Sequence, residues 1–287
     1  MKKFLLLAML SPIFSYGQWH VNLFGGFANY FGDLQEKAYT TQQSHGGFGA
    51  GLQYDLNGHF SILGNATYGM VGASDVYAKK ADLRARNLDF ETRIYEGNLL
   101  LEYNILDINQ HRFTPYAFGG VAIYHFNPFT HDSTGHKVYL RPLSTEGEGL
   151  AAYPDRKPYN LYQFAIPFGG GLKFRISDNV VLAYEIGLRK LFTDYLDDVS
   201  TTYVDEATLL AAKGPTAVHF AYRGNQVKGG GPGYPADGAP RGGAKNKDWY
   251  YFSGIRVSIA INTRGNNNTP AYHRRHSGVI DCPKHVY

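Results

Sequence analysis

Four aspartates stand close together after a long alternating segment, and they are the first residues that could carry chemistry. They are Asp194, Asp197, Asp198 and Asp205. Clustered carboxylates can bind Ca²⁺ through hard oxygen ligands. The spacing differs from that of an EF-hand loop, however, and the Ser-Thr-Thr run at 200–202 is typical of turns and helix caps. We therefore expect no metal here, with calcium at Asp194, Asp197 and Asp198 as the alternative.

The C-terminal tail, residues 264–287, contains a second group of potential ligands. Four side chains there could bind zinc: His273, His276, Cys282 and His285. Their gaps match no standard zinc finger. Cys282 is the only cysteine of the chain, and a leftover cysteine in an oxidising compartment indicates a free thiol or a disulfide with another chain. Our hypothesis is that Cys282, with Arg274 and Arg275, docks a periplasmic partner; the alternative is a disordered tail.

The N-terminus indicates export from the cytoplasm. Met1-Lys2-Lys3 precedes an apolar run at 4–14, and Ser15-Tyr16-Gly17 has small residues at its first and third positions. This pattern is typical of a signal peptide covering residues 1–17. The mature chain would begin at Gln18. Beyond the signal, the sequence has no apolar run of about 18 residues, so we expect no membrane-spanning helix.

The composition of the mature chain argues against a nucleic-acid partner. The whole chain has 28 Lys+Arg and 24 Asp+Glu, and removing Lys2 and Lys3 leaves 26 basic residues, which is nearly neutral. Aromatic residues and glycine are abundant, with 23 Tyr, 18 Phe and 34 Gly. An envelope protein that is rich in aromatics and glycine, and that has no spanning helix, is typical of an outer-membrane barrel.

Alternating hydrophobicity predicts strands along most of the chain. In the segment 179–192, large apolar residues stand at every second position, and the positions between them are mostly small or charged. Eight segments of this kind are predicted: 18–31, 46–56, 59–71, 89–104, 112–126, 161–176, 179–192 and 248–262. The alternation in 112–126 is unclear, because both faces contain apolar residues. These eight strands predict an all-β protein. Because bacterial outer-membrane barrels have an even number of antiparallel strands, we expect an eight-stranded antiparallel transmembrane barrel spanning 18–263.

The connections between these strands alternate in length. Those after the second, fourth and sixth strands are short, whereas 32–45, 72–88, 127–160 and 193–247 are long. Short periplasmic turns and long outer loops are typical of bacterial barrels, so both termini and the tail would be periplasmic. Several strands exceed the 9–11 residues that a tilted strand needs to cross, so the wall should rise beyond the membrane. Within the long loops, 205–213 is predicted to be a capped helix and 228–247 a mobile Gly/Pro-rich loop.

The interior of such a barrel is predicted to be filled rather than open. An eight-stranded barrel is only wide enough for its own side chains. Seven inward charges are expected to form an ion-pair network: Glu96, Glu102, Lys173, Arg175, Glu185, Arg189 and Arg256. A proton relay or an active site is the functional alternative to simple filling. A lipid-modifying barrel would need a Ser/His pair near the outer rim, and no nucleophile is visibly tied to His125 or His131.

Several short motifs resemble one barrel family. They are Tyr30-Phe31-Gly32-Asp33-Leu34, Arg86-Asn87-Leu88-Asp89-Phe90, Thr114-Pro115-Tyr116, Thr145-Glu146-Gly147, Ile166-Pro167-Phe168-Gly169 and the run from Phe192 to Ser200 with Tyr203 and Asp205. In their order and spacing, over about 18–261, they resemble the PorG-like outer-membrane barrels of the type IX secretion and gliding machinery of Bacteroidota.

The resemblance implies a protein that carries no chemistry of its own. Barrels of that family are associated with a periplasmic ring built from the lipoprotein PorK and its partner PorN, and help to tie the ring to the outer membrane. We therefore expect an outer-membrane protein with PorK/PorN-like partners, contact with outer-membrane lipid and no cofactor. The alternatives are a lipid-modifying barrel enzyme and a generic barrel that binds surface ligands through its long loops.

Overall fold

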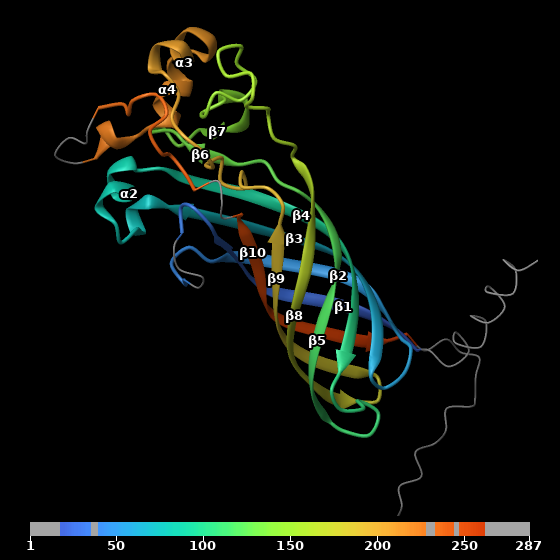
Figure 1. Ribbon diagram of the computed structural model, residues 1–287. Helices are drawn as coiled ribbons and strands as arrows, with labels where there is room; N and C mark the ends of the chain where they lie inside the picture. The colour runs from blue at the N-terminus through green and yellow to red at the C-terminus, as the bar shows by residue number, and fades with distance from the viewer. Residues whose placement is uncertain (1–17, 36–39, 228–232, 244–246, 262–287) are drawn as a thin grey trace, which may run out of the picture.

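Eight long antiparallel strands close into a barrel in the computed structural model, which describes residues 18–35, 40–227, 233–243 and 247–261 (Figure 1). They are β1 (Gln18–Phe31), β2 (His45–Asp55), β3 (Phe60–Ser74), β4 (Asp89–Asn104), β5 (Phe113–His125), β8 (Tyr162–Ser177), β9 (Val180–Leu191) and β10 (Trp249–Ala260). Each strand pairs with the next, and β10 pairs with β1 to close the ring. The predicted fold class is confirmed, and the strand bounds differ from the predicted ones by three residues at most.

The ambiguous strand β5 shows how aromatic residues fill the barrel. Tyr116, Phe118 and Tyr124 are buried inside, while Val121 and Ile123 are exposed outside. Both faces read as apolar because the interior contains rings as well as charges. Phe118 fits because Gly169 on β8 and Gly187 on β9 are register partners, and a Cβ on either would lie under 3 Å from the Phe118 ring.

The outward face of β4 changes character along its length. Asp89, Glu91 and Arg93 come first, and the exposed apolar side chains then begin at Tyr95 and end at Tyr103. From Tyr95 to Tyr103 the strand has nine residues, which is about the length that a tilted strand needs to cross a bilayer. The charged part lies nearer the long loops. The wall therefore extends beyond the apolar band on that side, as predicted.

Rows of aromatic rings border the apolar band at both edges. At the loop side, five rings on neighbouring strands follow one another: Phe48, Tyr68, Tyr95, His125 and Tyr162. Successive ring centroids lie 4.7–6.3 Å apart. At the turn side, the contacting pairs are Trp19–Tyr54, Phe60–Tyr103 and Phe113–Phe174, with centroids 4.9–5.0 Å apart. Aromatic girdles of this kind mark the two membrane–water interfaces of an outer-membrane barrel.

The long loops pack together as a folded cap at one end of the barrel, opposite the short turns (Figure 1). The cap contains η2 (Asp75–Tyr77), α2 (Ala81–Arg86), β6 (Phe129–His131), β7 (Lys137–Tyr139), η3 (Arg141–Leu143), α3 (Glu206–Lys213), α4 (Pro215–Ala221) and η4 (Gly224–Gln226). The predicted helix is confirmed as α3, whose N-cap Asp205 accepts a hydrogen bond from the Thr208 amide. In the described residues, no helix is long and apolar enough to cross a membrane.

The prediction of a mobile loop at 228–247 is wrong for residues 233–243. Thr202 forms a β-bridge with Pro240, and Arg241 is buried with about 3% of its surface exposed. A composition rich in glycine and proline suggests a mobile loop, but it does not show tertiary contacts. Here Arg241 holds the segment in place through its contacts with Glu146 and Asp198. The predicted signal peptide 1–17 and the predicted tail 264–287 lie outside the described residues.

Candidate functional site in the barrel interior and the cap

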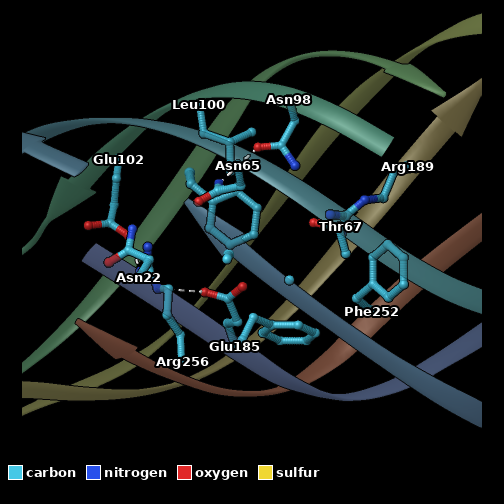
Figure 2. Close-up of a pocket in the computed structure, with 14 residues that line it drawn as sticks. Asn22, Asn65, Thr67, Asn98, Leu100, Glu102, Glu185, Arg189, Phe252 and Arg256 are labelled. Atoms are coloured by element: carbon cyan, nitrogen blue, oxygen red, sulfur yellow. Dashed lines mark hydrogen bonds and ion pairs between the residues drawn. The ribbon is translucent and has the colours of Figure 1, made fainter. Parts of the chain in front are cut away.

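The barrel interior contains two clusters of paired charges, seen in part in Figure 2. In the upper cluster, which is the one nearer the cap, Arg189 binds Glu96 through two hydrogen bonds of 2.9 and 3.0 Å. The Tyr250 hydroxyl donates to the same carboxylate at 2.6 Å, and the Asn98 amide donates at 2.7 Å. The Glu96 carboxylate is therefore surrounded by donors, as a buried charge must be.

In the lower cluster, which is the one nearer the short turns, Glu102 lies between two cations. It forms ion pairs with Lys173 and with Arg256. Arg256 also lies 3.2 Å from Glu185, whose carboxylate accepts a 2.8 Å hydrogen bond from Tyr116. Six of the seven predicted inward charges thus lie in ion pairs.

The placement of Arg175 in this network is wrong. It lies near the turn end of β8, two residues before the strand ends, and donates to the Asn109 carbonyl at 3.0 Å. The inward position there meets the β4–β5 turn, because the barrel interior ends at that height. Alternation predicts whether a side chain points inward or outward, but it does not predict how far along the barrel axis that side chain lies.

Between the two clusters, the described residues enclose a small cavity. It has a volume of about 30 Å³, and its lining includes Asn22, Asn65 and Glu185 (Figure 2). That volume holds one or two water molecules. Asn22 is buried, and neither amide atom has a protein partner. The arrangement supports filling by side chains and water rather than a substrate site, which normally needs several hundred cubic ångströms.

The cap has its own buried network, centred on Arg241. The guanidinium lies 3.1 Å from Glu146 and also donates to the Asp198 and Ala221 carbonyls. Glu146 in turn accepts hydrogen bonds from the amides of Ser200 and Thr201 at 2.9 Å. The contacts of this arginine and this glutamate therefore join four stretches of the chain, at residues 146, 198–201, 221 and 241.

The aspartates considered for calcium accept hydrogen bonds from separate protein donors. Asp194 accepts from Ser200, and Asp198 accepts from Thr145 and Tyr159 at 2.6 Å each. Burial raises the pKa of Asp194 and of Asp198 to about 6. Within the described ranges, no group of three or more His, Cys, Asp or Glu is arranged to hold a metal ion.

Asp197 and Asp248 share one tyrosine hydroxyl. Tyr30 Oη lies 2.6 Å from Asp197 Oδ2 and 2.8 Å from Asp248 Oδ1, and all three side chains are buried. The hydroxyl has one hydrogen, so it can donate to only one carboxylate; the second contact requires a proton on the other carboxyl. Burial raises the pKa of Asp197 and of Asp248 well above the ordinary range, in agreement with that geometry.

A third pair ties α2 to η2 and to the rest of the cap. Arg86 binds Asp75 through two hydrogen bonds of 2.8 Å and also donates to the carbonyls of Arg241 and Asp33. Sequence reasoning missed Arg86, Glu146 and Arg241 as network members. Two of the three lie in motifs that carried the family resemblance, and this is the signal that could have found them. Cys282, Arg274 and Arg275 lie outside the described residues.

The location of the protein follows from its exterior. Side chains such as Leu99 and Tyr95 remain more than half exposed around a closed barrel whose interior is charged. In water this would leave a large apolar belt uncovered, whereas in a bilayer it meets hydrocarbon. The chain is a bacterial outer-membrane β-barrel. Short turns at one edge and long loops at the other are typical of such barrels, in which the turns face the periplasm and the loops face outward.

Comparisons with known proteins find one family model and several solved structures. Residues 2–142 match the family model described as "Domain of unknown function (DUF6089)". The comparison with curated proteins gives no match.

Among solved structures, the barrel is similar to Ail, the attachment invasion locus protein of Yersinia pestis, with 10% identity over 85% of this chain and 99% of that one (TM-score 0.40). It is also similar to Neisserial surface protein A, with 8% identity over 85% and 97% (0.42). A third is OprG of Pseudomonas aeruginosa, with 12% identity over 85% and 97% (0.39). At these identities the likeness concerns the fold alone.

Proposed function

We propose that this barrel is a non-enzymatic component of the type IX secretion and gliding machinery, and that it ties a PorK/PorN-like periplasmic ring to the outer membrane. The observation that carries the proposal is the convergence of the resembling motifs. Tyr30, Arg86, Glu146 and Asp198 come from four separate motifs, and all four lie in the buried networks of the cap. Four of the motifs that carry the resemblance thus contribute to the buried networks of this cap rather than lying scattered over its surface.

The filled interior supports a scaffolding role. The Glu96 and Glu102 clusters occupy the barrel at two heights, and the cavity between them, of about 30 Å³, is too small for a substrate. Such a barrel offers its two ends and its outer wall for function. We propose that the periplasmic end carries the ring contact, and that Arg274 and Arg275 contribute to it.

Co-purification tests this function. An affinity tag inserted at Gly135, in the exposed β6–β7 turn, leaves the barrel and its periplasmic end untouched. After mild cross-linking and solubilisation of outer membranes, mass spectrometry should find PorK/PorN-like proteins enriched over an unrelated barrel tagged in the same way. Recovery of the barrel without ring proteins would refute the proposal. A changed lipid A mass after gene deletion would instead favour the lipid-modifying alternative.

Cys282 has its own test. If the thiol forms a disulfide with a ring protein, a non-reducing gel of membranes should show a high-mass adduct that disappears in a Cys282→Ser chain. An adduct pattern that is unchanged by the substitution would remove the disulfide from the proposal and leave the ring contact itself to the co-purification.

A further inference from the structure

A crevice of about 770 Å³ lies where the outer ends of β1, β9 and β10 meet the cap. Its walls come from three parts of the chain. The strand ends contribute Phe31, Lys190 and Trp249, the α2 region contributes Lys80 and Leu83, and the segment at 240–242 covers another side. A volume of this size is in the range of small-molecule sites.

The crevice begins where the apolar band ends. Phe31 is the register partner of Trp249, and Trp249 is the partner of Lys190, so the three form one row across neighbouring strands. On β9 the outward side chains are Tyr184, Ile186 and Leu188 before the row reaches Lys190, the first charge on that face. A lysine directly above an apolar band lies at the height of lipid headgroups.

The charges that line the crevice favour an anionic ligand. Lys80, Lys190 and Lys247 are exposed, against the two carboxylates of Asp33 and Asp82. Asp33 is turned toward the protein, since its Oδ2 accepts a 2.9 Å hydrogen bond from the Gly243 amide.

The crevice wall also includes two arginines whose charges are already neutralised. Arg86 pairs with Asp75, and Arg241 pairs with Glu146. They therefore shape the wall and add little to the local positive field.

We propose that this crevice binds the phosphorylated headgroup of an outer-leaflet glycolipid. The three lysines would bind phosphate, and the row of Phe31 and Trp249 would contact the sugar and the first part of the acyl chains. A lipid is favoured over a soluble phosphate because the mouth is continuous with the lipid-facing band, where Phe168 packs against Trp249 with ring centroids 6.0 Å apart. The proposal does not depend on the type IX assignment.

Lipid titration followed by native mass spectrometry tests it. The full-length protein in detergent is mixed with diphosphorylated lipid A, with monophosphorylated lipid A and with the fully dephosphorylated lipid. Retention should fall in that order. The triple variant Lys80→Gln/Lys190→Gln/Lys247→Gln should bind the diphosphorylated lipid about tenfold or more weakly than the unmodified chain.

The matched control is Lys157→Gln, which removes an exposed lysine of the outer loops away from the crevice and should bind normally. Heat-modified gel mobility checks that each variant is folded. Equal retention of the dephosphorylated lipid, or normal binding by the folded triple variant, would overturn the proposal. Displacement by glucosamine 1-phosphate at the same concentration as lipid A would show a soluble phosphate site and would also overturn it.

Discussion

Individual side chains inside this barrel are held by complementary charge, so removing one partner should cost more than removing both. Arg189→Met leaves the Glu96 carboxylate buried without its guanidinium, and we expect a loss of about 3–5 kcal/mol of unfolding free energy. The double variant Arg189→Met/Glu96→Gln should recover much of that loss. Denaturant unfolding in micelles, followed by gel mobility, measures both.

Arg175→Met is the matched control for this experiment, because Arg175 lies at the turn and binds a carbonyl rather than a buried carboxylate. Its effect should be within about 0.5 kcal/mol. If Arg189→Met were equally mild, the upper cluster would not be the compensated buried pair that its geometry indicates.

The acids of the cap predict a loss of local stability as the pH rises. Burial raises the pKa of Glu148 to about 8, so the folded cap holds a proton that the unfolded loop releases near its ordinary value of 4.5. The stabilisation is complete below the unfolded pKa and is lost progressively as the pH rises toward the folded pKa. Between about pH 4.5 and 8, amide protection over 193–205, corrected for intrinsic exchange, should decline.

Glu148→Gln should flatten this dependence, because the amide mimics the protonated acid in both states. A pH slope that is unchanged in the variant would assign the effect to other groups, such as Asp194 and Asp198, whose pKa values are raised to about 6.

At the scale of elements, the pairing of β8 with β9 depends on small residues facing an aromatic ring. A Cβ on Gly187 would lie 2.9 Å from the Phe118 ring and 2.6 Å from the Arg189 guanidinium. Gly187→Ala should therefore cost about 1–3 kcal/mol of unfolding free energy by overpacking. Gly64→Ala is the control, since a Cβ there meets nothing within 4 Å. Equal unfolding midpoints for the two variants would contradict this packing argument.

The strands could be predicted from the sequence because a period of two is local and lipid makes the outward face uniformly apolar. The α2 and α4 helices could not, because six or seven residues with no long amphipathic pattern form a helix only through tertiary contacts. The inward charges were found by alternation. Arg241 was missed because its role depends on Glu146 and Asp198, which are distant in the chain.

At the scale of the whole molecule, the apolar belt is the feature on which location depends. Leu99 lies on the lipid-facing side of β4 within the band, and Leu99→Arg should cost about 2–4 kcal/mol of folding free energy if it lies near the bilayer midplane. Val76→Arg, on the exposed η2 of the cap, should cost little. The fraction of heat-modifiable barrel after refolding into vesicles measures the difference. Equal folding of both variants would mean that this face does not meet hydrocarbon.

The hydroxyl shared by Asp197 and Asp248 has a consequence for assembly. Tyr30 is near the end of β1 and Asp248 directly precedes β10, so this contact spans the seam that joins the first strand to the last. This contact can form only when the first and last strands lie side by side, so it depends on closure of the barrel. Once it has formed, sideways opening of the wall between β1 and β10 would expose the buried side chains of Asp197 and Asp248.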